Sequence, residues 1–411
     1  MKVALLLSLL VSISTITFAQ SESSEVFIKQ LGASHTAVVS QGARGGASQG
    51  NSASIQQRGD NNETKIEQGT YEYAARNTAA VQQRGNGHEA SIIQGTMGGA
   101  ESNEATIEQT GGDNGASIVQ SEAGYSVAAN VAAVQQKGSA NQAGIRQGLL
   151  ASASNNEATI KQQGDRNEAN VKQGSSLGSA DYSSAFIQQL GDNNRATIDQ
   201  GLIEYSYDNA ATIQQKGSDN QVAIGQGVSS SASHSEATVQ QDGVRNNVEI
   251  SQGSVFGTGQ YHTVTVQQQG EENQALINQG SYGSSQSNEA SIQQRGSFNL
   301  AQINQFDESA SNVASLSQTG NNHVAIAQQG GDAFASDNLI DITQRGEAHY
   351  AVVYQGGEGS LSMSNTALID QQGSLHVASI AQQGSNLTTN IQQSGTGNVA
   401  YVGQGAAAII H

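Results

Sequence analysis

Apolar and polar residues alternate with a period of two along most of this chain. Between Asn103 and Gln120, two alternating segments flank four residues, Thr110 to Asp113, that include a glycine. The residues that share one face are Asn103, Ala105, Ile107 and Gln109 in the first segment, and Asn114, Ala116, Ile118 and Gln120 in the second. Such positions line one face of a strand but point in different directions on a helix. The pattern therefore predicts a strand, a four-residue turn and a second strand, with Gly111 in the turn because a positive φ is needed there.

This strand–turn–strand unit recurs fifteen times along the chain. Its first aliphatic residue recurs mostly every 26 or 27 residues, from Ile28 to Ile391, with Gln two residues later and Gly four residues later. Only the unit that begins at Leu316 is shorter by one residue, and we expect its second strand to end at Gln328. One unit cannot bury its own inward face, but stacked units can. We therefore predict an all-β fold: a cross-β-like β-solenoid of about fifteen repeats, with two facing parallel sheets and a longer return loop after each unit.

Stacking in register places identical side chains above one another in columns. Ile and Val columns bury apolar surface continuously. Gln and Asn carry a donor and an acceptor in one amide, so each side chain in a column can bond the next. The alternative is a Gln-rich surface that faces solvent. The predicted structural ladder comprises Gln30, Gln57, Gln83, Gln109, Gln136, Gln162, Gln189, Gln215, Gln68, Gln94, Gln120, Gln147, Asn62, Asn114, Asn141, Asn167, Gly59, Gly85 and Gly111.

The histidines also follow the repeat. His35, His88, His349 and His376 fall in the second-strand column that is otherwise mainly Asn, and His262 falls in the matching first-strand column. We expect them to replace Asn in a ladder. Because His349 and His376 belong to adjacent repeats, a weak metal site or a pH effect is the alternative. The sequence predicts no catalytic residue, no cofactor-binding residue and no resident metal.

The first nineteen residues have a different pattern. Lys2 precedes an apolar run from Ala4 to about Ile16, and Thr17-Phe18-Ala19 is a plausible cleavage site before Gln20. The run is too short to span a bilayer, so residues 1–19 are interpreted as a secretory signal rather than as a membrane anchor. The remaining predicted segments are a short N-terminal segment at 20–24, the solenoid at 25–405, and a tail at 406–411 that alternates like half a repeat.

Composition and charge narrow the choice of function. The chain has 48 Gly but no Pro, Cys or Trp, and its aromatic content is 4%. Disorder is the competing interpretation of so polar a chain, but the absence of Pro favours stacked strands, where Pro cannot donate to the ladder. The net charge of −18 argues against nucleic acid and anionic membrane as partners, since both bind basic surfaces.

The unit resembles the curlin repeat. The segment Gln109-Thr-Gly111-Gly-Asp-Asn114-Gly-Ala116-Ser-Ile-Val-Gln120 matches the Gln-x-Gly-x2-Asn-x-Ala-x3-Gln part of that repeat, as does the segment from Gln162 to Gln173. The resemblance extends over about 24–405 and implies a bacterial extracellular amyloid fibre of the biofilm matrix that mediates adhesion. It also implies a nucleator, an outer-membrane secretion channel and periplasmic chaperones as partners. The repeats are longer than the family's usual 22 residues, and only Gln20 to Ser24 precede them where the family has an export segment.

These features together predict a secreted, non-enzymatic fibre subunit that polymerises with itself head to tail. The first and last units keep the repeat pattern, so neither end has the atypical capping repeat of a soluble solenoid. The alternatives are a fibre nucleator and a monomeric solenoid that binds ice or carbohydrate. An enzyme is disfavoured because no break in the repeat brings carboxylates or His together in a cleft.

Overall fold

The computed structural model divides the chain into two compact units, Met1–Asp208 and Asn209–His411, each described here by itself. The structure describes residues 2–7, 13–18, 21–42, 48–69, 74–95, 99–121, 127–148, 153–174, 180–201, 206–227, 232–253, 259–280, 285–306, 309–330, 334–356 and 361–405. The predicted tail at 406–411 lies outside the described residues.

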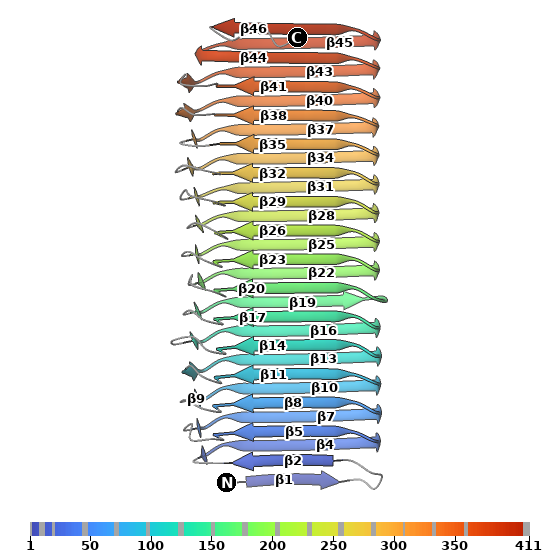
Figure 1. Cartoon of the computed structure of the whole chain (residues 1–411), viewed down its shortest axis with the longest axis vertical. Coiled ribbons are helices and arrows are strands. Elements are labelled where there is room, and N and C mark those ends of the chain that lie inside the picture. Colours follow the sequence, from blue (N-terminus) through green and yellow to red (C-terminus); the bar gives the residue numbers. More distant parts are fainter. Residues whose placement is uncertain are drawn as a thin grey trace. The chain divides into compact units, whose positions relative to one another are not determined.

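Each unit is a β-solenoid whose turns contain a long strand, a six-residue strand and a two-residue strand (Figure 1). In the first unit the long strands are β4 Glu25–Ala33, β7 Ser52–Asp60, β10 Thr78–Asn86, β13 Glu104–Gly112, β16 Val131–Ser139, β19 Glu157–Gln163 and β22 Ser184–Asp192. The six-residue strands are β5 Thr36–Gln41, β8 Glu63–Gln68, β11 Glu89–Gln94, β14 Gly115–Gln120, β17 Gln142–Gln147, β20 Glu168–Gln173 and β23 Arg195–Gln200. The two-residue strands are β3 Ser21–Glu22, β6 Ser48–Gln49, β9 Ala74–Ala75, β12 Ala100–Glu101, β15 Val127–Ala128, β18 Ala153–Ser154, β21 Ala180–Asp181 and β24 Ser206–Tyr207.

The second unit repeats this order. Its long strands are β25 Ala210–Ser218, β28 Glu236–Val244, β31 Thr263–Glu271, β34 Glu289–Ser297, β37 Val313–Asn321, β40 Leu339–Glu347, β43 Thr366–Ser374 and β45 Thr388–Thr396. The strands that follow them are β26 Gln221–Gln226, β29 Asn247–Gln252, β32 Gln274–Gln279, β35 Leu300–Gln305, β38 Val324–Gln329, β41 Tyr350–Gln355, β44 Val377–Ser385 and β46 Val399–Gly405. The two-residue strands are β27 Ala232–Ser233, β30 Gly259–Gln260, β33 Ser285–Gln286, β36 Ser309–Ala310, β39 Ala335–Ser336 and β42 Ser362–Met363.

All strand pairs are parallel, and equivalent residues of successive repeats lie directly opposite each other. In the first unit Ile107 of β13 pairs with Val134 of β16, and Ile118 of β14 pairs with Ile145 of β17. The long strands form one sheet and the six-residue strands form the sheet that faces it (Figure 1). The predicted all-β solenoid with two facing parallel sheets is therefore confirmed.

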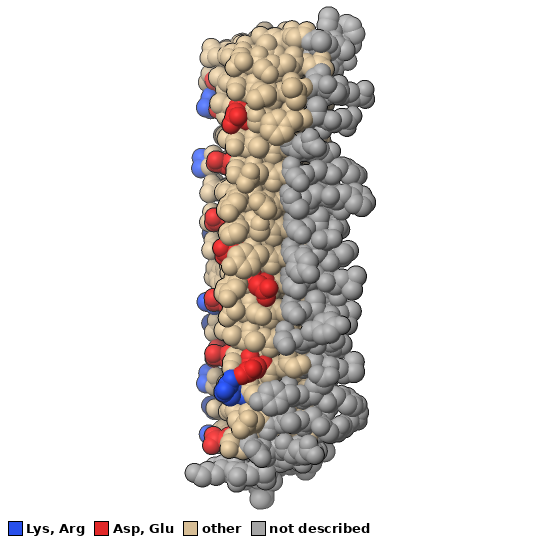
Figure 2. Space-filling view, turned by 90° about the vertical axis from the view of Figure 1, so that its left-hand side faces the viewer, with Lys and Arg blue, Asp and Glu red and all other residues tan. Residues whose placement is uncertain are grey.

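The core between the sheets consists of aliphatic and alanine columns. Ile107 and Ile118 are fully buried, and Ala105 beside them lets the sheets approach closely. Each buried Ile contributes about 1.5–3 kcal/mol relative to an exposed one. On the side of the molecule that Figure 2 shows, most of the described Lys, Arg, Asp and Glu side chains lie along one margin, and a few lie on the face beside it. Burial thus follows the period-two pattern: apolar and amide residues point inward, and charged residues point outward.

The turn prediction was wrong in its extent. Strand β13 continues through Gly111 and Gly112, which pair with Gly138 and Ser139 of β16, because the parallel ladder does not stop at the glycine. The chain reverses at Asp113, which has a φ of 53°. The return segment also differs from a plain loop, since each two-residue strand pairs with its equivalent in the next turn.

The prediction for the Leu316 unit was also wrong. Strand β38 ends at Gln329, and Ala327 rather than Ile326 pairs with the core residue Ile303. Gln329 accepts a hydrogen bond from Gln305 at 3.0 Å and donates one to Gln355 at 3.2 Å. The unit therefore has the full length, and the amide bonds outweigh the burial that Ile326 would gain from a one-residue slip.

Residues in the predicted secretory signal form two strands. Strand β1 Lys2–Leu7 pairs with β4, and strand β2 Ile13–Phe18 pairs with β5. The assignment of residues 1–19 as a signal stays a prediction. In the part of the chain that the structure describes, there is no helix long and apolar enough to cross a bilayer.

Candidate functional site

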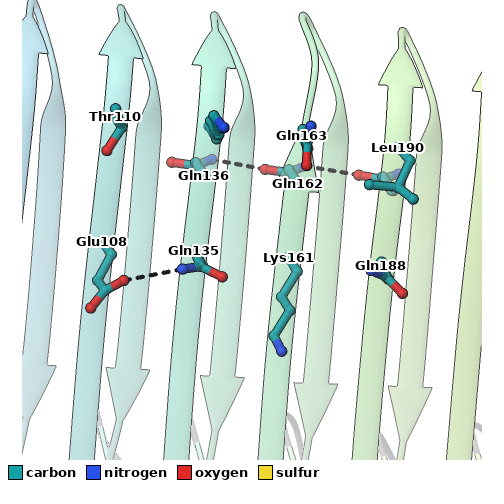
Figure 3. A pocket seen from close by; sticks show the side chains of 11 residues that line it. Glu108, Thr110, Gln135, Gln136, Lys161, Gln162, Gln163, Gln188 and Leu190 are labelled. Atoms are coloured by element: carbon teal, nitrogen blue, oxygen red, sulfur yellow. Dashed lines mark hydrogen bonds between the residues drawn. The ribbon is translucent and has the colours of Figure 1, made fainter.

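The inward Gln residues of the long strands form one continuous amide column in each unit. Gln83 Nε2 donates to Gln109 Oε1 at 3.0 Å, and Gln109 Nε2 donates to Gln136 Oε1 at 2.9 Å. Figure 3 shows the same dashed contact from Gln136 to Gln162, at 2.9 Å, behind the outward side chains of Gln135 and Lys161. The predicted ladder residues of this column are all buried: Gln30, Gln57, Gln83, Gln109, Gln136, Gln162, Gln189 and Gln215.

The six-residue strands carry a second Gln column. Gln68 donates to Gln94 at 2.9 Å, Gln94 to Gln120 at 2.8 Å, and Gln120 to Gln147 at 2.9 Å. All four predicted residues are fully buried. Among the described residues of each unit, the Gln-to-Gln bonds in both columns join the Nε2 of one turn to the Oε1 of the next turn along the chain.

The second N–H of each amide binds a backbone carbonyl across the core. Gln109 Nε2 also donates to Asn114 O at 2.9 Å, and Gln83 Nε2 to Glu63 O at 3.0 Å. A buried amide with both N–H groups and its oxygen bonded avoids the penalty of an unpaired polar group. The columns therefore stabilise the stack and fix the register between its turns.

Asn residues form a corner column where the chain enters the six-residue strands. Asn114 Nδ2 donates to Gly138 O at 2.8 Å, and Asn114 Oδ1 accepts from the backbone N of Asn141 at 3.0 Å. Asn141 makes the equivalent bonds to Gly164 O, at 2.7 Å, and to Asn167 N, at 3.0 Å. The predicted residues Asn62, Asn114, Asn141 and Asn167 are all buried there.

A second Asn corner, before each long strand, was not among the predicted ladder residues. Asn103 N donates to Asn77 Oδ1 at 2.9 Å, and Asn103 Nδ2 donates to Val127 O at 3.1 Å. The buried members of this corner in the first unit are Asn51, Asn77, Asn103, Asn130 and Asn156. The recurrence of Asn immediately before the first alternating residue was the signal that could have identified them.

The predicted Gly residues lie where successive turns approach most closely. Gly111 has a φ of +120°, and a Cβ at this position would overlap the carbonyl oxygen of Gly138 in the next turn. Gly59 and Gly85 have the same relation to the turns that follow them. Glycine is needed here both for its backbone conformation and for stacking distance.

The histidines occupy the corner columns, as substitutes for Asn. His35, His88, His349 and His376 are buried in the Asn114 column, and His262 is buried in the Asn103 column. His323, which the sequence analysis did not include, belongs to the same column as His349 and His376. The rings of His323 and His349 stack with centroids 4.9 Å apart, and those of His349 and His376 with centroids 5.0 Å apart.

Both ring nitrogens of each stacked histidine are engaged. His349 Nε2 lies 3.0 Å from Arg345 O, and His349 Nδ1 accepts from His376 N at 3.3 Å. This arrangement needs a neutral ring that carries its proton on Nε2. Burial lowers the pKa of His323 to about 4 and also lowers the pKa of His349. The described residues contain no group of three or more His, Cys, Asp or Glu side chains that could hold a metal ion.

The two ends of the columns carry different groups. At the N-terminal end Gln41 is fully buried and donates to Gln68 at 2.7 Å, but its Oε1 has no hydrogen-bond partner among the described residues. In the last turn Gln404 Nε2 donates to Thr388 O at 3.1 Å, so one of its two N–H groups has no acceptor in the described part of the chain. Val399 and Tyr401 of the same strand are more than half exposed.

Comparison with known families agrees with this geometry. The model of the Curlin associated repeat matches residues 153–201, 335–364 and 362–393. The matched segments lie in both units, and each contains Gln and Asn residues of the columns described above. Comparison with curated proteins gave no match. The curlin repeat expected from the sequence pattern is thus confirmed in these three segments.

Proposed function

We propose that this chain, a curlin-repeat protein, is the structural subunit of an extracellular amyloid fibre that assembles head to tail, as part of a biofilm matrix and in cell adhesion. One observation carries the proposal: within each unit, most turns present to the next turn the same groups that they receive from the turn before. Ile pairs with Ile or Val, Gln donates to Gln, and the Asn oxygen accepts the following backbone N–H. A stack of this kind has no internal reason to stop.

The direction of the amide bonds determines which ends can meet. Because each Gln donates toward higher residue numbers, the first turn offers an acceptor and the last turn offers a donor. Among the described residues, Gln41 Oε1 is a buried acceptor without a partner, and one N–H of Gln404 Nε2 has no acceptor. Two first turns would bring two acceptors together. Pairing of the last turn of one copy with the first turn of another is therefore favoured, and such unlike ends produce an open filament.

The last turn also presents strand edges. Strands β45 and β46 pair with β43 and β44 on one side. An exposed edge of this kind is a template for another chain. Secretion to the cell surface, a nucleator, a secretion channel and chaperones belong to the same proposal, and their support is the curlin repeat.

The test uses the purified chain 20–411. It should convert to a β-rich form on incubation, seed fresh protein, and give a meridional reflection at about 4.8 Å. A chain that stays monomeric at high concentration would contradict the fibre proposal and favour a solenoid that binds a ligand such as carbohydrate or ice.

A matched pair of variants tests the end groups. The double change Gln393→Leu and Gln404→Leu removes the donors of the last turn and should slow elongation from seeds at least about fivefold, since a buried acceptor is then left unpaired. The control is Gln392→Leu, because Gln392 is exposed on the outward face of β45. Equal elongation rates for the double variant and the control would exclude the amide columns as the contact between copies.

A further inference from the structure

Residues 2–18 cover the edge of the first complete turn. Strand β1 pairs with β4 from Lys2 opposite Glu25 to Leu7 opposite Gln30. Strand β2 pairs with β5 from Ile13 to Phe18, which lies opposite Gln41. The edge that the proposed fibre would use at its N-terminal end is therefore occupied by the chain's own first residues.

This segment imitates a turn at the apolar columns. Leu5 lies opposite Ile28, and Ile16 lies opposite Val39. Both are aliphatic residues at aliphatic positions, as in the internal repeats. Backbone pairing thus continues through residues 2–7 and 13–18, with aliphatic residues at the register positions that are aliphatic in the internal repeats.

The segment has no Gln at either of the two positions that continue the Gln columns. Leu7 takes the position of the first column and Phe18 that of the second. Neither residue has a side-chain amide. The consequence is visible at Gln41, which is 0% exposed and whose Oε1 has no partner in the described residues. One turn further along the same column, Gln68 Oε1 has the donor that Gln41 lacks, since Gln41 itself donates to it at 2.7 Å.

A better occupant for this edge exists in the chain itself. In the last turn Gln393 pairs with Gln371, and Gln404 pairs with Gln382, in the register of the internal repeats. Stacked on the first turn of another copy, Gln404 would supply the N–H that Gln41 needs. The same turn would continue the aliphatic columns through Ile391 and Val402.

We propose that residues 2–18 are a provisional cap on the growing edge, which the last turn of a second copy replaces. The inference rests on the proposed fibre function and adds a way in which assembly is delayed. The cap closes the strand edge but leaves the amide column incomplete. Cutting before Gln20 would remove both cap strands and leave β4 and β5 open for a second copy.

The first experiment compares the chains 1–411 and 20–411 at equal concentration. The full chain should assemble with a lag at least about fivefold longer, because an edge must be vacated before it can pair. Hydrogen exchange of the freshly dissolved monomers gives an independent readout. The amides of Thr36–Gln41 should be protected in the full chain and exchange faster in 20–411.

The second experiment repairs the cap. Phe18→Gln in the full chain places an amide opposite Gln41 and should lengthen the lag by a further factor of about five or more, since the unpaired acceptor then gains a donor. The matched control is Thr17→Gln, which lies opposite the outward residue Ser40 and should leave the lag unchanged. A full chain with its first nineteen residues in scrambled order controls for their apolar character and should behave like 20–411.

The outcomes separate this inference from the fibre proposal. Assembly of 20–411 supports the fibre proposal whatever the cap does. If 20–411 assembles and the full chain has the same lag and the same exchange rates, the cap does not exist. If Phe18→Gln and Thr17→Gln have the same effect, the incomplete amide column has no role and the inference is overturned.

Discussion

The corner column that precedes the six-residue strands contains runs of different chemistry. Asn114, Asn141 and Asn167 occupy consecutive turns in the first unit, whereas His323, His349 and His376 occupy consecutive turns in the second. Both residue types accept a hydrogen bond from the backbone N–H of the next corner residue, at 3.0 Å for Asn141 to Asn114 and 3.3 Å for His376 to His349. The column therefore requires an acceptor that faces the next turn, and either Asn Oδ1 or a neutral His Nδ1 meets the requirement.

The donor side of the corner differs between the Asn run and the His run. Asn141 Nδ2 donates to Gly164 O of the next turn, whereas His349 Nε2 donates to Arg345 O of its own turn. The His column compensates through stacking of its rings. Asn141 is linked to the next turn by three hydrogen bonds, because its Oδ1 accepts from both the backbone N and the Nδ2 of Asn167, at 3.0 and 3.1 Å. His349 is linked to the next turn by one hydrogen bond and a ring contact. Only the His version depends on a protonation state.

The largest expected effect concerns the Gln columns, which do not vary between the units. Gln136→Lys removes the acceptor for Gln109 and buries a charge, so it should lower the free energy of unfolding by about 3 kcal/mol or more. The matched control is Gln135→Lys, on the outward face of the same strand, which should change it by less than about 0.5 kcal/mol. Denaturant unfolding of the monomeric chain 20–411 measures both. Equal effects would mean that the column is not buried in solution.

Asn141→Leu should destabilise the first unit by about 2 kcal/mol, because the N–H of Asn167 and the carbonyl of Gly164 lose their partners. Gln142→Leu is the control, since the Gln142 side chain is exposed on the outward face and the change leaves its backbone N–H, which donates to Asn167 O, in place. Hydrogen exchange of the backbone amides in β17 and β20 shows where the stability is lost. A variant as stable as the control would show that shape alone maintains the corner.

Acid should weaken the second unit more than the first. Burial lowers the pKa of His323 to about 4 and lowers that of His349 below 6.5, so the unfolded chain binds protons that the folded chain excludes. Stability is therefore fully present above pH 6.5 and falls as the pH decreases from 6.5 toward 4, by about 2 kcal/mol in all. Unfolding measured at pH 8 and pH 5 tests this. The triple variant His323→Asn, His349→Asn, His376→Asn should reduce the difference without abolishing it, because burial also lowers the pKa of His262, in the other corner column, to about 4. An unchanged pH dependence would contradict the assignment.

The smallest expected effect is that of replacing a corner Asn with the His that occupies the same position in other turns. His88 already lies between Asn62 and Asn114, with its N–H and Nδ1 bonded to them at 3.0 and 3.3 Å. Asn141→His should therefore cost less than about 1 kcal/mol at pH 8 and increase the acid sensitivity of the first unit, where burial already lowers the pKa of His88. A large loss of stability at pH 8 would show that packing against the neighbouring turns, rather than the corner hydrogen bonds, requires Asn at this position.

Much of the fold could be predicted because the repeat is local and strict. The positions of Ile107, Gln109 and Gly111 identify the inward face, and fifteen copies of the pattern leave little choice of architecture. The corners were harder to identify, since Asn77 and Asn103 precede the strands and their bonding depends on the following turn. The two-residue strands could not be found from alternation, because two residues are too few to show a period.

The sequence by itself determined the period, the two inward faces and the residues that fill the columns, since each of these depends only on spacing along one strand. The tertiary structure alone decided the register and the ends. At β38 both Ile326 and Ala327 could face inward by local pattern, and the bonds from Gln305 to Gln329 and from Gln329 to Gln355 select Ala327. At Gln41 the missing donor appears only when Phe18 is placed opposite it. Hydrogen bonds between turns connect residues more than twenty positions apart, so the partner of each amide becomes known only once the turns are stacked.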